Sequence, residues 1–494
     1  MNQPSKKLKI AVIGAGFSGL SAASYAGMAG HQVHVFEKHA IPGGRARQFT
    51  TPEGYVFDMG PSWYWMPDII EDFFKDFGRS ANEFYDLVSL DPQFEILFKE
   101  DKVNLPKDYS EQKALFESIE KGAGEQLDAF MEDAKYKYEV GMRQFVSKPS
   151  HSWLEFFSPT IAKSALRLDL LSDYRSFVAK YFKDSRLRTI MEFPVIFLGA
   201  SPKDIPALYS LMNYGGYQMG TFYPMGGFFE LVKAMEQIAL SQGVTFHYSS
   251  NVEKIITEGG KATALQIDGQ YHFFDQIIAS SDYHHTETKL PAEKRNYTEA
   301  YWEKRTFAPS CLIYYLGVRE KIEGLKHHTL FFEHDLDPHI ETIYGNKRWP
   351  ENPLFYVCCP SKTDPEVAPE GKENIFLLMP LAIGIEDEES VREKYLQEML
   401  QRIEKHTGAK DLHSKLEYKR SYCVSDFKKD YNAYGGNAYG LANILSQTAV
   451  LKPKLKNKKL KNLFYTGQLT VPGPGVPPSI ISGKIAAREA TKNT

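Results

Sequence analysis

A glycine-rich turn lies between a strand and a helix at the start of the chain, and a second strand follows it. The turn reads Gly14-Ala15-Gly16-Phe17-Ser18-Gly19, after an apolar strand at 9–13 and before a helix that continues to residue 29. Gly14 permits the tight turn, Gly16 lets the backbone approach a pyrophosphate, and Gly19 lets the helix pack closely on the strand. The helix N-terminus then faces the negative charge. This arrangement is the dinucleotide-binding βαβ unit.

Glu37 ends the second strand and stands about 20 residues after the turn, where a carboxylate accepts hydrogen bonds from both ribose hydroxyls of an adenosine. The same charge repels a 2′-phosphate, which disfavours NADP. A glycine-rich turn alone is weak evidence, but here the strand, the helix, the second strand and the acid are all present. The unit therefore predicts FAD or NAD, with expected contacts from Gly14, Gly16, Phe17, Ser18, Gly19, Glu37 and Lys38.

The length and charge of the chain limit what it can be. Its 494 residues exceed what one hydrophobic core normally serves, so we expect two or three domains. A net charge of −3 argues against nucleic acid as the main partner. No stretch of about 18 uncharged apolar residues is present, so we expect no segment to span a bilayer. Residues 1–8 are polar and lead directly into the first strand, which leaves no room for a signal peptide.

The spacing of cysteine and histidine predicts no metal site. The four cysteines form no CxxC pair, which favours thiols in a reducing compartment. The histidine pairs His284-His285 and His327-His328 have no cysteine or carboxylate at ligand spacing along the chain. We therefore expect no bound metal.

Segments with α/β character occur at the start, in the middle and at the end of the chain. Between them, residues 108–221 have mainly helical periodicity, and 286–415 mix strands with a helix at about 388–406. We predict an α/β fold in which a discontinuous Rossmann-like domain is assembled from residues 1–107, 222–285 and 416–494. NAD dehydrogenases are not usually built in this way.

Three further segments suit a flavin. Gly43-Gly44-Arg45 offers backbone donors beside a cation, which suits a second contact with the FAD pyrophosphate. Gly60-Pro61-Ser62 follows a strand, and its backbone could line the isoalloxazine ring. Near the end, a strand delivers Gly467-Gln468 to a glycine/proline loop that leads to Gly475-Val476 at a helix N-terminus. The partial positive charge of that terminus would stabilise an anionic reduced ring, which NAD does not need. FAD is therefore the predicted cofactor.

These motifs, together with Tyr223-Pro224-Met225-Gly226-Gly227 and the ending Pro472-Gly473-Pro474-Gly475-Val476-Pro477, resemble the bacterial-type carotenoid desaturases of the flavin amine-oxidase superfamily. The resemblance covers essentially the whole chain, and the phytoene desaturases are the most similar. It implies an FAD domain, a mixed-sheet substrate domain at 286–415, and a helical substrate region at 108–221 that faces a membrane. It also implies a cytoplasmic protein bound peripherally to the inner face of the cell membrane, where a carotenoid is drawn from the bilayer.

The activity that the resemblance implies is stepwise removal of hydrogen pairs from phytoene toward lycopene. The alternative is desaturation of another carotenoid, such as a 1-hydroxycarotenoid 3,4-desaturation. More distant alternatives are a flavin amine oxidase and a non-enzymatic prenyl-binding relative. An amine oxidase would want acidic residues that hold a substrate cation, and a non-enzymatic relative would have lost the FAD motifs that are intact here.

Candidate substrate contacts are aromatic. Trp63 and Trp65 directly follow the Gly60-Pro61-Ser62 turn, and we expect them, with Phe197, to form the wall of a tunnel. A polyene has no ionisable group, so no strong base is required, and we assign no catalytic residue. Glu192 is a candidate proton acceptor, with a helix-end carboxylate as the alternative.

Two segments are candidates for contact with a membrane. Residues 153–171 have an interfacial amphipathic pattern, which a core-facing helix would share. A basic stretch of six lysines at 452–461 could attract anionic lipid or be a solvated loop.

Overall fold

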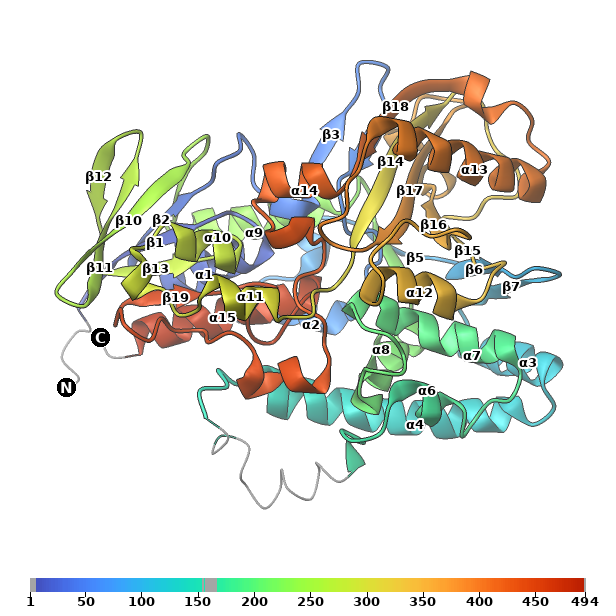
Figure 1. The fold of residues 1–494 in the computed structure, drawn as a ribbon, viewed down its shortest axis with the longest axis horizontal. Helices are drawn as coiled ribbons and strands as arrows, with labels where there is room; N and C mark the ends of the chain where they lie inside the picture. The colour runs from blue at the N-terminus through green and yellow to red at the C-terminus, as the bar shows by residue number, and fades with distance from the viewer. Residues whose placement is uncertain (1–5, 153–154, 156–166, 493–494) are drawn as a thin grey trace.

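The computed structural model describes residues 6–152, 155 and 167–492, without the side chains of Arg143, Gln144 and Phe197. A parallel five-stranded sheet lies at one end of the molecule (Figure 1). Its strands, in spatial order, are β19 (Leu463–Tyr465), β13 (Gln276–Ala279), β1 (Lys9–Ile13), β2 (Gln32–Phe36) and β9 (Thr245–His247). The sheet therefore draws on the beginning, the middle and the end of the chain. The central strand β1 is almost wholly apolar because it is covered on both faces.

The first and last helices pack directly against each other beside this sheet. They are α1 (Phe17–Met28) and α15 (Val476–Thr491), and α9 (Phe229–Ser241) also contacts α1. Glycine permits the close approach, because a Cβ added at Gly483 would lie 2.3 Å from the carbonyl oxygen of Ser18. A second sheet of β10 (Val252–Glu258), β11 (Lys261–Ile267) and β12 (Gln270–Phe273) is antiparallel and lies at the outer edge of the same domain.

A mixed seven-stranded sheet forms the other half of the molecule. In spatial order it contains β18 (Leu416–Tyr422), β14 (Ser310–Val318), β17 (Glu373–Leu381), β16 (Phe355–Cys358), β15 (His328–Phe331), β6 (Phe94–Leu97) and β7 (Lys102–Leu105). Only β15 and β6 pair in parallel within this sheet. Side chains of β14 alternate between two cores: Leu312, Tyr314 and Leu316 pack on the side of α13 (Glu389–Thr407), and Ile313 and Tyr315 pack on the opposite side.

Helices cover the opposite side of the mixed sheet (Figure 1). They are α3 (Tyr109–Ile119), α4 (Ala123–Val140), α6 (Tyr174–Val178), α7 (Ser185–Glu192), α8 (Leu211–Asn213) and α12 (Leu336–Tyr344). The remaining helices are α2 (Pro67–Asp76), α10 (Tyr283–Thr288), α11 (Glu299–Glu303) and α14 (Val424–Tyr431). Two short antiparallel pairs complete the described fold: β3 (Gln48–Thr50) with β4 (Val56–Asp58), and β5 (Leu87–Ser89) with β8 (Phe222–Pro224).

The predicted α/β class with mixed sheets is confirmed. The predicted domain limits do not match the composition of the two sheets. Strands β6, β7 and β18 lie within the segments predicted for the FAD domain, but they pair into the mixed sheet. Their partners are far away in sequence, as in the pairing of β6 with β15. The part of the chain that the structure describes contains no helix with both the length and the apolar composition needed to cross a bilayer. Most of the amphipathic segment predicted at 153–171 lies outside the described residues, so its contact with a membrane stays a prediction.

The contact between α1 and α15 gives a first testable expectation. Replacing Gly483 by Ala puts a methyl group against backbone atoms of α1, and overpacking of this kind costs about 1–3 kcal/mol. We expect Gly483→Ala to lower the free energy of unfolding by that amount in urea titrations. Gly141→Ala is the matched control, because its Cβ would lie at an ordinary 3.4 Å from Leu211 in helical backbone. Equal stability of the two variants would contradict the close helix contact.

Candidate functional site

The glycine-rich turn lies at the N-terminus of α1, as its sequence predicted. Gly14 has a left-handed backbone with φ of +98°, and its N–H donates to the carbonyl of Phe36 at 2.8 Å. A Cβ at Gly19 would lie only 2.0 Å from Gly14 O, so Gly19 serves packing of the helix on the turn rather than contact with a ligand. The free N–H groups of the first turn of α1 make this a site for anions.

Glu37 is buried at the carboxyl end of β2, where it also orders the neighbouring loops. Its Oε2 accepts a hydrogen bond from the N–H of Ala15 at 2.8 Å, and its Oε1 accepts one from His39 at 3.0 Å. Each carboxylate oxygen has a further lone pair for a ribose hydroxyl. Lys38, beside it, is half-buried and donates to the carbonyl of Lys429 at 3.3 Å.

The second glycine loop touches the first. The N–H of Gly43 donates to the carbonyl of Ala15 at 2.8 Å, and a Cβ at Gly44 would lie 3.3 Å from the Cα of Gly16. Arg45 follows them and is largely buried, which lowers the pKa of its guanidinium. Its side chain donates to the carbonyl of Asn437 at 3.2 Å, but its Nε has no partner among the described residues. A buried cation with an unused donor fits the pyrophosphate of a dinucleotide.

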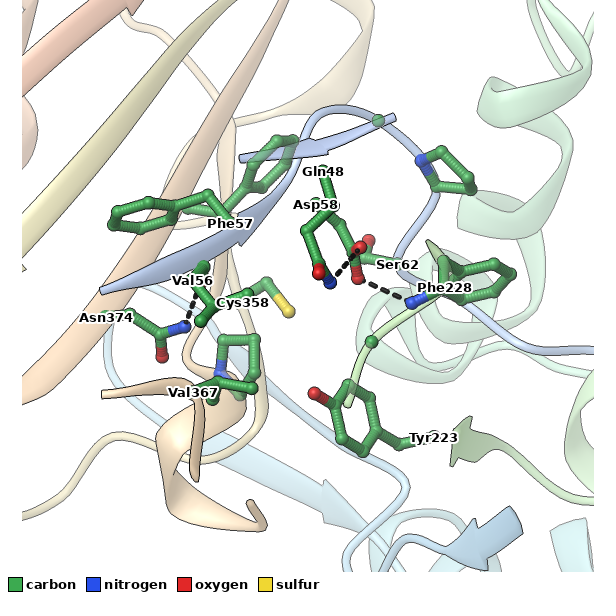
Figure 2. A pocket seen from close by; sticks show the side chains of 15 residues that line it. Gln48, Val56, Phe57, Asp58, Ser62, Tyr223, Phe228, Cys358, Val367 and Asn374 are labelled. Carbon is green, nitrogen blue, oxygen red and sulfur yellow. Dashed lines mark hydrogen bonds between the residues drawn. The ribbon is translucent and has the colours of Figure 1, made fainter. Parts of the chain in front are cut away.

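The loop at Gly60-Pro61-Ser62 is held from two sides. Tyr315 of β14 donates from its hydroxyl to the carbonyl of Met59 at 2.9 Å, and Tyr356 of β16 donates to Ser62 Oγ at 3.0 Å. On the other side, Asp58 accepts from the N–H of Phe228 at 2.6 Å, next to the Gly226-Gly227 turn (Figure 2). Two motifs that are far apart in sequence are therefore joined by one carboxylate.

The C-terminal glycine/proline motif lies beside the loop of Arg45. Gly467 and Gly475 both have left-handed backbone, with φ of +104° and +112°, and α15 begins directly after Gly475. Gln468 donates to Asn437 Oδ1 at 3.1 Å, which is the residue whose carbonyl binds Arg45.

All these loops line one cavity of about 2330 Å³, counting its open mouth. Its lining extends from Glu37 and the N-terminus of α1 to Trp63 and Trp65, so the sites predicted for a dinucleotide and for a second molecule share one cavity. The predicted site residues that line it are Gly14, Gly16, Phe17, Ser18, Glu37, Lys38, Gly43, Gly44, Arg45, Gly60, Pro61, Ser62, Trp63, Trp65, Gly467, Gln468, Gly475 and Val476.

Comparison with known proteins identifies the family. The family model described as flavin containing amine oxidoreductase matches residues 17–491. A carotenoid 3,4-desaturase of Haloarcula japonica is 38% identical over 97% of this chain and 97% of its own length. The chain belongs to the flavin-containing amine oxidoreductases, and within them to the carotenoid desaturases. A zeta-carotene-forming phytoene desaturase of Myxococcus xanthus is 29% identical over 98% of this chain and 94% of its own length.

Solved structures support the fold of this desaturase. An oxidoreductase of Methanosarcina mazei superposes with a TM-score of 0.61 at 18% identity, covering 96% of this chain and 99% of its own. Putrescine oxidase bound to putrescine superposes with a TM-score of 0.62 at 12% identity, covering 98% and 99%. At these identities the similarity concerns the fold alone.

FAD is the cofactor of the desaturase, and the residues present fit it. The N-terminus of α1 and the unused Nε of Arg45 suit the pyrophosphate, and Glu37 suits the adenosine ribose. The N-terminus of α15, after the positive-φ Gly475, suits a partial negative charge on the flavin.

Several cavity residues were missed by sequence reasoning. Asp282 follows β13 and caps α10 through the N–H of His285, and its Oδ2 is buried without a partner among the described residues. Burial raises the pKa of Asp282 and lowers that of His285 to about 4. Their position could have been found, because ligands bind beyond the carboxyl ends of parallel strands.

The apolar part of the cavity adjoins the flavin loop. Trp65 donates from its indole to Thr221 at 2.8 Å, and Trp63 meets it edge-on with ring centres 5.3 Å apart. The other apolar side chains of this part are Met66, Leu198, Met212, Ile313 and Leu378. The side chain of Phe197 lies outside the described residues, so its predicted contact with substrate stays a prediction.

Glu192 does not line this cavity. It is buried at the end of α7, where its carboxylate accepts from Arg175 at 2.9 Å. Burial raises the pKa of Glu192, whereas Arg175 opposes the shift. Arg175 also pairs with Asp337 of α12. The structure therefore gives Glu192 a partner at the helix end and no place in the described lining of the cavity.

The histidine pair at 327–328 has a cysteine neighbour that its spacing in sequence concealed. Cys358 lies opposite His328 in the β15–β16 pairing. The three side chains are buried, and one ligand atom from each lies within 4.8 Å of the others. Spacing along the chain does not reveal this neighbour, and the expectation of no bound metal stays a prediction.

The lysine stretch is also less uniform than expected. Lys452 is buried beside Gly473, and its Nζ donates to Asn443 Oδ1 at 3.0 Å. Burial lowers the pKa of Lys452 to about 8. Lys458 and Lys459 of the same stretch are exposed.

The environment of Glu37 predicts how FAD binding responds to its substitution. Glu37→Gln removes the charge that strengthens hydrogen bonds to the ribose, and such bonds contribute about 1.5–3 kcal/mol. We expect FAD to bind about 10- to 100-fold more weakly, measured by fluorescence titration of the apoprotein. The exposed Glu53→Gln is the control. Unchanged affinity of Glu37→Gln would exclude the proposed ribose contact.

Burial of Lys452 predicts a pH dependence of stability. Because its folded pKa of about 8 lies below the ordinary value of 10.5, the folded state binds fewer protons between these pH values than the unfolded state. Stability therefore rises with pH across this window, by up to about 3 kcal/mol. Lys452→Met removes this contribution. We expect its unfolding free energy, relative to wild type, to fall as pH rises from 8 to 10.5, and Lys459→Met to show no such trend.

Proposed function

We propose that this carotenoid desaturase acts on the C3–C4 bond near the end of a carotenoid, such as a 1-hydroxycarotenoid. The similarity of 38% to a carotenoid 3,4-desaturase supports this substrate over phytoene, since the phytoene desaturase compared is 29% identical. The alternative that the sequence left open thus has better support than the first expectation.

The observation that supports a carotenoid, as opposed to an amine, as the substrate is the apolar extension of the FAD cavity. Its described walls beyond the flavin loop are tryptophan, tyrosine, methionine, leucine and isoleucine, and the cavity's acids lie on the cofactor side. A substrate amine would require acids in the apolar part, so an amine oxidase activity is not supported. A long apolar molecule suits these walls.

The residues of the chain bind and orient such a substrate. When bound, FAD supplies the acceptor for a hydride from the allylic carbon. Trp63 and Trp65 pack edge-on after the loop of Ser62, and Thr221 anchors Trp65, so these two side chains would orient a polyene beside that loop. The neighbouring double bonds spread the developing positive charge, so the proton that leaves next needs only water or a weak base.

Phytoene is the second candidate substrate. Among the carotenoid desaturases, the phytoene desaturases resemble this sequence most, and relatives that form zeta-carotene or 4,4'-diaponeurosporene match almost the whole chain. The same apolar cavity would accept this hydrocarbon.

We also propose that the substrate enters from a bilayer to which the protein binds peripherally, at the cytoplasmic face. Exposed leucines support this proposal: Leu171 stands at the end of the segment predicted to contact a membrane, and Leu445 and Leu451 precede Lys454 in sequence. Lys454 connects its own segment to residues 150–151, because its Nζ donates to the carbonyls of Ser150 and His151. Basic and apolar groups side by side are typical of an interfacial surface.

Expression in bacterial hosts that accumulate either phytoene or a 1-hydroxycarotene tests the substrate. We expect the hydroxylated substrate to gain one double bond, seen as a loss of two mass units and a longer-wavelength chromophore. Conversion of phytoene alone would favour the second candidate. An unchanged pigment pattern in both hosts, with FAD-loaded protein, would overturn both.

A pair of methionine variants tests the cavity itself. Met212 lines the cavity and Met219 does not, although both are partly buried in the same region. We expect Met212→Trp to cut conversion by about 100-fold with normal FAD content, because the polyene is displaced. Met219→Trp should keep most activity.

A further inference from the structure

Two histidines and a cysteine meet inside the mixed sheet, outside the lining of the FAD cavity. His328 and Cys358 are direct partners in the antiparallel pairing of β15 with β16, so they lie on the same face of the sheet. His327 precedes β15, and its ring centre lies 4.5 Å from that of His328. The three side chains are 5%, 0% and 2% exposed for His327, His328 and Cys358.

One nitrogen of each imidazole is already held. Nδ1 of His327 lies 2.7 Å from Thr363 Oγ1, and Nδ1 of His328 lies 2.7 Å from the hydroxyl oxygen of Tyr356. Since Tyr356 donates its own proton to Ser62, its oxygen is free to accept from the Nδ1–H of His328. That tautomer leaves a lone pair on Nε2 of His328.

The two Nε2 atoms are buried and have no hydrogen-bond partner among the described residues. Such buried polar atoms are rare in folded proteins unless something absent from the coordinates satisfies them. An Nδ1 bonded to an oxygen and a free Nε2 is also the arrangement found in histidines that bind metals. Burial lowers the pKa of His327 to about 3 and that of His328 well below its ordinary value, which favours the neutral, ligating form of both rings.

We propose that His327, His328 and Cys358 bind a thiophilic d¹⁰ cation, Zn²⁺ or Cu⁺. A ligand atom from each residue lies within 4.8 Å of the other two. A tetrahedral ion with bonds of about 2.0–2.3 Å holds its donors about 3.5 Å apart, so small side-chain rotations complete the site. On binding, the Cys358 S–H bond breaks, the proton leaves to solvent, and the thiolate bonds to the metal without any change in oxidation state.

The charge around the site fits either ion. Cu⁺ with one thiolate and two neutral imidazoles is uncharged, which suits a buried position. Zn²⁺ leaves one positive charge, and the carboxylate of Asp58 lies near enough to Cys358 to influence its pKa. In Figure 2 the sulfur of Cys358 points into the small pocket that Asp58 and Tyr223 also line.

The metal would have a structural effect on the active site. His328 stacks on Trp63 with ring centres 4.1 Å apart, and it holds Tyr356, which binds Ser62 of the flavin loop. A bound ion would therefore lock the wall of the substrate cavity against the mixed sheet. This inference is independent of which carotenoid is the substrate.

Metal content of the purified FAD-loaded chain is the primary test. After exposure to Zn²⁺ or to Cu⁺ under reducing conditions, followed by gel filtration, elemental analysis should find about one metal per chain. X-ray absorption should show one sulfur at about 2.3 Å and two nitrogens at about 2.0 Å. Competition with chelators then tells which of the two ions binds more tightly.

Two serine variants provide the matched comparison. Cys358→Ser should weaken binding at least 100-fold, whereas Cys359→Ser should bind like wild type, because Cys359 is equally buried but packs in the core on the other face of β16. Less than about 0.1 metal per chain in FAD-loaded wild type would overturn the proposal even if a variant fails to fold. Equal metal content and sulfur coordination in Cys358→Ser and wild type would also overturn it.

Discussion

Direct packing of backbone on backbone at glycine holds the two ends of the chain together and forms the cofactor cavity. A Cβ at Gly19 would lie 2.0 Å from Gly14 O, and one at Gly483 would lie 2.3 Å from Ser18 O. With no side chains between them, residues 14–19, 43–45 and 467–476 converge on one cavity. Binding of FAD and docking of α15 on α1 are therefore not independent, because a group that separates these loops also widens the helix contact.

The parts of the site that sequence reasoning predicted are those whose chemistry is local. In the first motif, the strand, the turn, the helix and Glu37 occupy about 30 consecutive residues, and each requirement is for backbone conformation or charge at a fixed offset. The same holds for Gly475 before α15, where positive φ and a helix start are encoded within a few residues. Such motifs identify a cofactor because the pyrophosphate and the ribose are the same in every member of the family.

The parts of the site that sequence reasoning missed depend on contacts between segments that are distant in sequence. Cys358 reaches His328 only through the register of β15 and β16, and β6 reaches β15 across more than 200 residues of sequence. Burial of Lys452 likewise follows from how its loop packs against Gly473, whereas its lysine-rich surroundings suggest solvent. Glu192 has an ordinary helix-end sequence, and its partner Arg175 becomes visible only once α6 and α7 are packed.

The identity of the substrate is harder to encode than that of the cofactor. An apolar pocket rejects an added hydroxyl by only about 100-fold, so the apolar walls around Trp65 and Met212 do not by themselves select between phytoene and a hydroxylated carotene. The hydroxyls at the flavin loop are already engaged, since Tyr356 binds Ser62 and His328. Which bond is oxidised must then depend on how far the polyene enters before its end meets a wall. The choice of bond therefore depends on the length of the cavity. Residues from many elements determine that length, so no single motif along the chain encodes it.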